Sequence, residues 1–246
     1  MTEKPRQPPF RVIGYLESCF QEKFATPRQP QLAPGAHARL RILPEFLPEH
    51  SLKGLEGFSH VWLVTWMHLC TSKSFLPMVH PPRLRGAKQG VFATRSPHRP
   101  NPIGLSLARL GKIEGDTLHL YGLDLVDGTP VLDLKPYLPD ADHAPGASGG
   151  WTEKNEFPRL KVEFSARAEA DLAGAPADLR RLIEDVLSHD PRNHRDRAQM
   201  AEGFDMGFFV CGRDVHFSVK AGTATVLYID AEARFVKKFR RQKPAS

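Results

Sequence analysis

The feature that most constrains this chain is a series of short, β-rich runs that precede about residue 140. The runs cover residues 11–18, 37–43, 58–68, 90–93, 104–113, 117–123 and 131–134. Turn signals such as Pro34-Gly35, Glu114-Gly115-Asp116 and Asp127-Gly128 separate them. Many short strands with few helical periods favour a β-barrel or a β-sandwich. We therefore expect a mainly β protein, with one β domain over residues 8–140.

The remaining sequence predicts a linker and a smaller α+β domain. Residues 141–158 show almost no apolar periodicity, which is typical of a linker. In residues 159–240 the pattern predicts one helix, with strands near residues 208–211, 215–219 and 225–229. Pro176 suits the first turn of that helix, and Pro191 ends it. The apolar stripe of the helix has the spacing i, i+3, i+4, i+7, i+8 and consists of Leu179, Leu182, Ile183, Val186 and Leu187.

Composition narrows the possible classes of protein. No apolar run approaches the roughly 20 residues needed to span a bilayer. The first nine residues are polar and proline-rich, unlike the apolar core of a secretory signal, so we expect a cytoplasmic protein. The three cysteines, Cys19, Cys70 and Cys211, are widely spaced and form no Cys-x-x-Cys pair. Since no His-Glu-x-x-His pattern occurs either, we expect reduced structural thiols and no metal.

The most unusual stretch is the loop VFATRSPHRPNPIGLS at residues 91–106. Arg95 and Arg99 supply two permanent cations, His98 lies between them, and three prolines restrict the backbone. Guanidinium groups in fixed positions suit carboxylates and phosphates. The residue types alone leave an alternative open, namely a stiff, exposed turn with solvated arginines. The net charge of +6 permits a polyanionic partner without requiring one.

This loop resembles the Arg-Ser-x-x-Arg-Pro-Asn-Pro-Ile-Gly signature of the TrmO (TsaA-like) family of tRNA adenosine N6-methyltransferases. Further blocks in the same order resemble that family, and they cover most of the chain. These blocks are EKFATPRQP at 22–30, GLEGFSH at 54–60, residues 81–84 and 90–96, LDLVDGTPVLDLKPYLP at 123–139, and a helix that ends SHDPR at 188–192.

The resemblance implies a small β-barrel that binds S-adenosylmethionine and works as a homodimer. It also implies methylation of N6 on the threonylcarbamoylated adenosine at position 37 of threonine tRNA, next to the anticodon. No Gly-x-Gly-x-x-Gly occurs in the chain, which argues independently against a doubly wound methyltransferase. By resemblance, the cofactor-binding residues are Pro27, Arg28, Gln29, His68, Arg95, Leu105, Asp124, Leu125, Val126 and Asp127.

Without the resemblance, the residue types at several of these positions are explained by secondary structure alone. His68 extends a period-two strand face with His60, Trp62 and Trp66, and Asp127-Gly128 alone predicts only a hairpin turn. Asp127 and His98 are the candidates for a catalytic base, and a mechanism without a protein base is equally open.

The anticodon loop offers unstacked bases and phosphates, which arginine and lysine side chains recognise. The basic residues that we expect near tRNA are Arg83, Arg85, Lys88, Arg99, Arg192, Arg195 and Arg197, together with Arg95 of the same loop. The chain departs from the bacterial pattern after Arg192, where Asn193-His194-Arg195 replaces Pro-Ala-Tyr. Two alternatives therefore stay open: a methyltransferase of this fold with another substrate, and a non-catalytic RNA-binding barrel.

Overall fold

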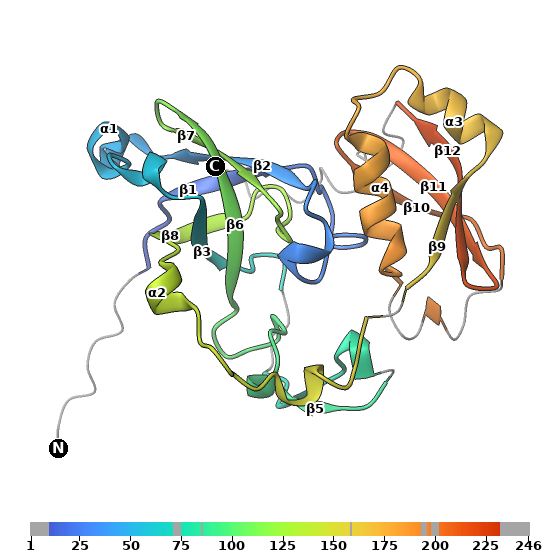
Figure 1. The fold of residues 1–246 in the computed structure, drawn as a ribbon, viewed down its shortest axis with the longest axis horizontal. Helices are drawn as coiled ribbons and strands as arrows, with labels where there is room; N and C mark the ends of the chain where they lie inside the picture. The colour runs from blue at the N-terminus through green and yellow to red at the C-terminus, as the bar shows by residue number, and fades with distance from the viewer. Residues whose placement is uncertain are drawn as a thin grey trace.

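The computed structural model describes residues 10–70, 75–84, 86–157, 159–192, 196–197 and 202–231, which form a β-barrel beside a smaller α+β domain (Figure 1). The strands are β1 (Gly14–Ser18), β2 (His37–Ile42), β3 (His60–Trp66), β4 (Met78–Val79), β5 (Gln89–Gly90), β6 (Ile103–Glu114), β7 (Thr117–Tyr121), β8 (Pro130–Pro136), β9 (Lys161–Phe164), β10 (Met206–Val210), β11 (Arg213–Lys220) and β12 (Thr223–Asp230). The helices are α1 (Pro48–Ser51), α2 (Pro139–Asp142), α3 (Ala166–Leu172) and α4 (Leu179–Ser188). The expected fold class, mainly β with a barrel and a smaller α+β domain, is confirmed.

The barrel is closed, with the strand order β1-β2-β7-β6-β3-β8. All its strand pairs are antiparallel, and β8 returns to β1 through the pairs Gly14↔Val131 and Tyr15↔Pro130. Period-two alternation turns every second side chain inward, so that Leu16, Leu40 and Leu63 lie fully buried in its core. Because the barrel is closed, the strand ends and the loops that connect them lie at its rims.

One predicted strand is wrong. Residues 90–93 were expected to continue the β pattern, but only Gln89–Gly90 pairs, with the two-residue strand β4. Val91–Ala93 instead forms a turn of 3-10 helix that is closed by a hydrogen bond from the Thr94 N–H to the Val91 carbonyl. The Val91 N–H still donates to the Pro77 carbonyl at 3.0 Å, but β4 has only two residues, so among the described residues no strand lies beside the rest of this segment.

The predicted linker lies against the long excursion between β3 and β6, which Figure 1 draws at the bottom. It contains α2 and a 3-10 turn, Gly150–Thr152. The indole N–H of Trp151 donates to the Ala93 carbonyl at 2.8 Å. The Arg83 guanidinium lies 4.0 Å from the centre of the Phe157 ring and donates to the Thr152 carbonyl at 3.4 Å. These contacts connect the segment to the proline-arginine loop.

The second domain is a four-stranded sheet in the order β10-β11-β12-β9, on which α3 and α4 pack. Only β9 runs parallel to its neighbour, β12. The predicted helix is confirmed as α4, and all five residues of the predicted apolar stripe are buried. The three predicted strands of this domain correspond to β10, β11 and β12.

The core of the second domain is completed by residues that precede β2. Phe20, Ala33 and Ala36 are buried in the same cluster as Phe208 and Phe217 of the sheet. Phe20 also forms an antiparallel bridge with Val210. The segment between β1 and β2 therefore belongs to the core of the second domain, while the barrel strands enclose a core of their own.

Candidate active site

The proline-arginine loop is held from within by one of its own arginines. The Arg99 guanidinium donates to the carbonyl oxygens of Val91 at 3.0 Å and Thr94 at 2.7 Å. It also lies 5.4 Å from the centre of the Phe92 ring. Arg95, in contrast, is exposed and donates to the Gln29 side-chain carbonyl at 3.0 Å. Arg95 is therefore an exposed cation, whereas Arg99 stabilises the loop from within.

A carboxylate lies within electrostatic reach of Arg95. The Ser106 hydroxyl, on the barrel-facing side of β6, donates to Oδ1 of Asp124 at 2.5 Å. Burial raises the pKa of Asp124 to about 6, and the Ser106 hydrogen bond and the charge of Arg95 oppose that rise. Three predicted residues, Gln29, Arg95 and Asp124, thus come together with Ser106, which the sequence analysis did not select.

Asp124→Asn should stabilise the fold at alkaline pH. Because the pKa of Asp124 is raised on folding, its ionisation costs free energy above about pH 6, and this cost disappears below about pH 4. A rise from 3.8 to about 6 corresponds to at most about 3 kcal/mol. Urea unfolding at pH 8 should show a gain of up to this size for the variant, with little gain at pH 4. The exposed residue Asp140 provides the control, Asp140→Asn. Equal gains at both pH values would contradict the assignment.

Asp127 and His68 form a second group beside the first. Oδ1 of Asp127 accepts the Ser18 N–H at 2.9 Å, and the Asp127 N–H donates to the Phe20 carbonyl at 2.7 Å. Burial and the nearby Lys23 lower the pKa of His68, while Asp127 acts in the opposite direction. The surroundings of His68 therefore favour the neutral imidazole, because its pKa lies below the ordinary value. The 124–127 segment joins the two groups along one edge of the barrel.

Other predicted cofactor residues point elsewhere. Pro27 and Arg28 line a small crevice against α4, and the Arg28 guanidinium donates to the carbonyls of Pro191 and Arg192 at 3.2 and 3.3 Å. Burial lowers the pKa of Arg28. The Leu105 side chain is 51% exposed and points to the opposite face of β6 from Ser106. The side chain of Leu125 lies in the barrel core, while the carbonyl groups of Leu125 and Val126 accept from Ser18 and Thr129.

Some of the predicted RNA-binding residues are held by contacts within the chain, and others are exposed. Arg192 forms two hydrogen bonds with the buried carboxylate of Asp190, at 2.8 and 2.9 Å, and Arg197 lies 3.8 Å from the same group. Lys88 is exposed. Arg83 and Arg99 make the contacts described above, whereas Arg85 and Arg195 lie outside the described residues. The catalytic candidate His98 is exposed, with its Nδ1 3.6 Å from the Cys70 sulfur.

Comparison with known proteins explains why this loop, these strands and this second domain occur together. The family model for the tRNA-methyltransferase O N-terminal domain matches residues 15–143, and the model for the TrmO C-terminal domain matches residues 158–232. The chain belongs to the TrmO family. A crystal structure of TrmO from Pseudomonas aeruginosa superimposes with a TM-score of 0.76 and 39% sequence identity, and the match covers 92% of this chain and 100% of that one.

Relatives of the TrmO family include a tRNA (adenine(37)-N6)-methyltransferase of Escherichia coli K12. It is 42% identical over 191 residues, which are 74% of this chain and 81% of that protein. A Pseudomonas aeruginosa relative, 48% identical over 185 residues, has a name that refers to S-adenosylmethionine-dependent methyl transfer. The mouse tRNA (adenine(37)-N6)-methyltransferase is 56% identical over 161 residues, but the match spans only 36% of its length.

Sequence reasoning missed Ser106 and Lys23 as parts of this TrmO-type site. Ser106 is the last residue of the quoted loop motif. The alternation of side chains along β6 turns it inward, and this alternation could have identified it from the sequence. Lys23 donates to the Leu69 carbonyl from the early loop. That contact joins segments far apart in the chain, and no local pattern predicts it.

Proposed function

We propose that this chain is an S-adenosylmethionine-dependent methyltransferase that methylates N6 of the threonylcarbamoylated adenosine at position 37 of threonine tRNA. Membership of the TrmO family over both domains supports the proposal. The observation that carries it is an exposed cation, Arg95, within electrostatic reach of the carboxylate of Asp124 beside a closed barrel. The name of the Escherichia coli relative supports the position on tRNA.

The residues present fit the charges of the cofactor. S-adenosylmethionine carries a carboxylate, which suits Arg95, and an ammonium and a sulfonium, which suit carboxylates. Asp124 is mostly ionised at pH 7, because its pKa is about 6. The hydrogen bond that Arg95 donates to Gln29 and the one that Ser106 donates to Asp124 hold the two charges in place before any ligand arrives. Such preorganisation reduces the entropy lost on binding.

The cofactor supplies an electrophilic methyl group on a positively charged sulfur. The chain has to align the attacking nitrogen with that group and exclude water. A carbamoyl substituent makes the adenosine N6–H more acidic, so a weak base suffices. Asp127 has one oxygen occupied by the Ser18 N–H, which leaves Oδ2 to accept the N6 proton. His98 remains the second candidate, and we expect the reaction to need no metal.

Calorimetric titration with S-adenosylmethionine and S-adenosylhomocysteine tests the proposal against a non-catalytic RNA-binding barrel. A methyltransferase should give saturable heat with both compounds, and a pure RNA binder should give none. A methyltransferase with another substrate would bind the cofactor but leave threonine tRNA unmodified. The altered segment after Arg192, which lies outside the described residues, motivates that alternative.

We further propose a division of tasks between barrel residues 8–140, linker residues 141–158 and a tRNA-positioning domain at residues 159–240. The exposed cations Lys88 and Arg95 favour tRNA contact beside the cofactor. Arg192 and Arg197 share the Asp190 carboxylate, so their cluster retains net positive charge at the end of α4. Within the described residues no helix is both long and apolar enough to cross a membrane. We propose the cytoplasm as the place of action, where tRNA is available.

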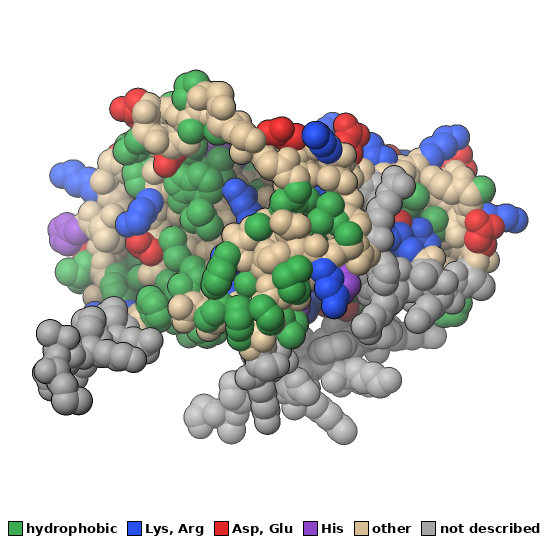
Figure 2. Space-filling model, turned by 90° about the horizontal axis from the view of Figure 1, so that it is seen from below, with side chains coloured by type: hydrophobic (Ala, Val, Ile, Leu, Met, Phe, Trp, Pro, Cys, Tyr) green, Lys and Arg blue, Asp and Glu red, His purple; other side chains and the backbone are tan. Residues whose placement is uncertain are grey.

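A homodimer is also part of the proposal. An apolar patch on the excursion before the proline-arginine loop consists of Phe75, Leu76, Met78 and Phe92, of which Phe92 is 71% exposed. The Phe75 and Phe92 rings stack at 6.2 Å. Figure 2, which views the molecule from below, shows hydrophobic side chains gathered on this face. An exposed patch of this kind favours a protein interface.

Phe92→Asp should convert the dimer into a monomer. The charge would have to be desolvated at the centre of the patch, which costs several kcal/mol unless it is paired. Light scattering should give about twice the chain mass of 27.5 kDa for the wild type and about one chain mass for the variant. Phe10→Asp, at an exposed position outside the patch, is the control and should remain dimeric. A wild-type protein that is monomeric at micromolar concentration with cofactor present would contradict the proposal.

A further inference from the structure

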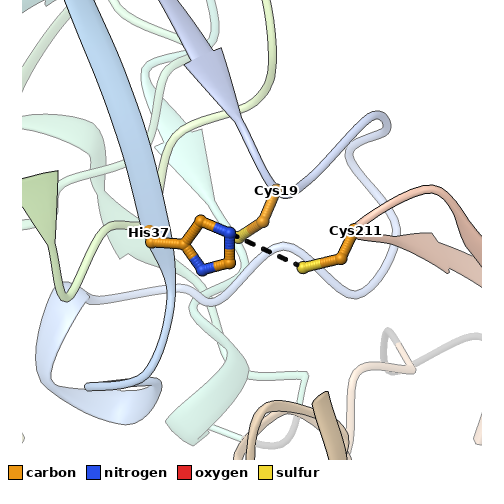
Figure 3. Close-up of side chains that lie close together, drawn as sticks. All are labelled: Cys19, His37 and Cys211. Atoms are coloured by element: carbon orange, nitrogen blue, oxygen red, sulfur yellow. Dashed lines mark hydrogen bonds between the residues drawn. The ribbon is translucent and has the colours of Figure 1, made fainter. Parts of the chain in front are cut away.

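Cys19, His37 and Cys211 meet where the two domains join (Figure 3). Cys19 directly follows β1, His37 begins β2, and Cys211 lies in the turn between β10 and β11. One ligand atom from each residue lies within 4.8 Å of the others. The three segments are far apart in the sequence, which is why the spacing of the cysteines gave no sign of the cluster.

Backbone hydrogen bonds hold the three residues together. The Cys211 N–H donates to the Cys19 carbonyl at 2.8 Å, and the Cys19 N–H donates to the His37 carbonyl at 3.1 Å. The bridge between Phe20 and Val210 lies immediately beside this contact. The side chains therefore converge from a fixed frame, which is what a metal site requires of its ligands.

The distances and atom types suit a tetrahedral metal ion. The Cys211 sulfur and His37 Nε2 are 4.0 Å apart. In a tetrahedral zinc site, metal bonds of about 2.3 Å to sulfur and 2.0–2.1 Å to nitrogen place these atoms about 3.6 Å apart and two sulfurs about 3.8 Å apart. A small rotation of the side chains closes the difference. Two thiolates and an imidazole favour Zn²⁺ over the oxygen-seeking Mg²⁺ and Ca²⁺.

The surroundings of His37 match those of a metal ligand. Oδ2 of Asp178 lies 3.9 Å from His37 Nδ1, on the side of the ring away from the cysteines. Ligating histidines usually direct their second nitrogen toward a carboxylate, a carbonyl or water. His37 is 43% exposed and Cys19 is buried, so the cluster has a closed end and a solvent side through which an ion can enter.

Cys211 is held in a tight hairpin turn between β10 and β11. Cys211 and Gly212 both have positive φ, of 51° and 72°, as the two central residues of a tight hairpin turn require. Asn, Asp or Gly normally occupies the first of these positions, and other residues are strained there by about 1–3 kcal/mol. Ala221 and Gly222 have the same pair of positive φ angles, 47° and 79°, in the hairpin between β11 and β12, so this conformation places the Cys211 side chain without itself indicating a ligand.

We propose that Cys19, His37 and Cys211 bind one Zn²⁺ ion that joins the second domain to the barrel. Binding releases two thiol protons to solvent, and the two thiolates then neutralise the charge of the ion. The fourth position, on the solvent side, is taken by water. This site shares no residue with the proposed cofactor site, but the two adjoin, because Cys19 is flanked by Ser18 and Phe20, whose backbone groups form hydrogen bonds with Asp127. The zinc proposal does not depend on the proposed activity.

The test measures zinc in untagged, reduced, full-length protein after gel filtration. Wild type should retain about one zinc per chain, as should Cys70→Ser, the matched control in the remaining cysteine. Cys211→Ser and His37→Gln should retain almost none. His37 is partly exposed, so its variant should remain folded. Loading with Co²⁺ should give a thiolate charge-transfer band in wild type and Cys70→Ser only.

A stability measurement completes the test. Zinc should raise the melting temperature of wild type by about 5–10 °C over protein treated with a chelator, if the free ion is at about 100 times its Kd. Cys211→Ser should show no such shift. The proposal is overturned if wild type retains no zinc, if the variants retain as much as wild type, or if Cys19 and Cys211 form a disulfide and the reduced protein still binds no metal.

Discussion

Phe20→Ala should destabilise the whole protein by about 3–5 kcal/mol, although the residue lies in a short segment between two barrel strands. Phe20 is 1% exposed and lies in the core of the second domain with Phe208 and Phe217. Truncation leaves a cavity between the sheet of the second domain, helix α4 and the segment that precedes β2, and such packed elements collapse only partly to fill it. Urea unfolding followed by tryptophan fluorescence and circular dichroism measures the loss.

The control is Phe10→Ala, because Phe10 is 63% exposed and should contribute less than about 0.5 kcal/mol. If the two variants are equally stable, Phe20 does not complete the core of the second domain as described. Because the segment between β1 and β2 completes the core of the second domain, we further predict that the barrel and the second domain of the wild type unfold in one transition.

Arg95→Ala should weaken S-adenosylmethionine binding about ten- to hundredfold and leave the fold intact. Arg95 is exposed, so its removal opens no cavity. Loss of one charge-assisted hydrogen bond costs about 1.5–3 kcal/mol. Isothermal titration with the cofactor measures the change in Kd, and thermal unfolding checks the fold.

Two further variants make this result specific. Lys88→Ala removes an exposed cation from the same region and should leave the cofactor Kd unchanged. Arg95→Lys retains the charge but not the planar donor pair, so it should recover part of the affinity. Unchanged affinity in folded Arg95→Ala would show that Arg95 serves another ligand, with tRNA phosphate as the first candidate.

Local patterns in the sequence predicted most of the architecture. Each barrel strand alternates with period two between turn residues, and the α4 stripe has helical spacing, so both can be recognised without knowledge of distant contacts. The 3-10 turn at Val91–Ala93 was missed because its apolar residues resemble a strand, and only the short partner strand β4 decides otherwise.

The site was less predictable, because its contacts join distant segments. Family resemblance placed Arg28 in the cofactor wall, yet its guanidinium donates to carbonyls at the end of α4, 163 residues further along the chain. The spacing of the prolines and arginines does not predict which arginine stabilises the loop. In the structure Arg99 forms hydrogen bonds within the loop, whereas Arg95 is exposed. The convergence of Cys19 and Cys211 likewise depends on the packing of one domain on the other.

The proposed reaction is methylation of the modified adenosine beside the anticodon of threonine tRNA. The direct test incubates the purified protein with S-adenosylmethionine and threonine tRNA from a strain without its own enzyme for this step. The nucleosides are then analysed by mass spectrometry. We predict that threonylcarbamoyladenosine becomes heavier by one methyl group, and that tRNA without the threonylcarbamoyl group stays unchanged. An unchanged nucleoside, with protein that binds the cofactor normally, would contradict the account.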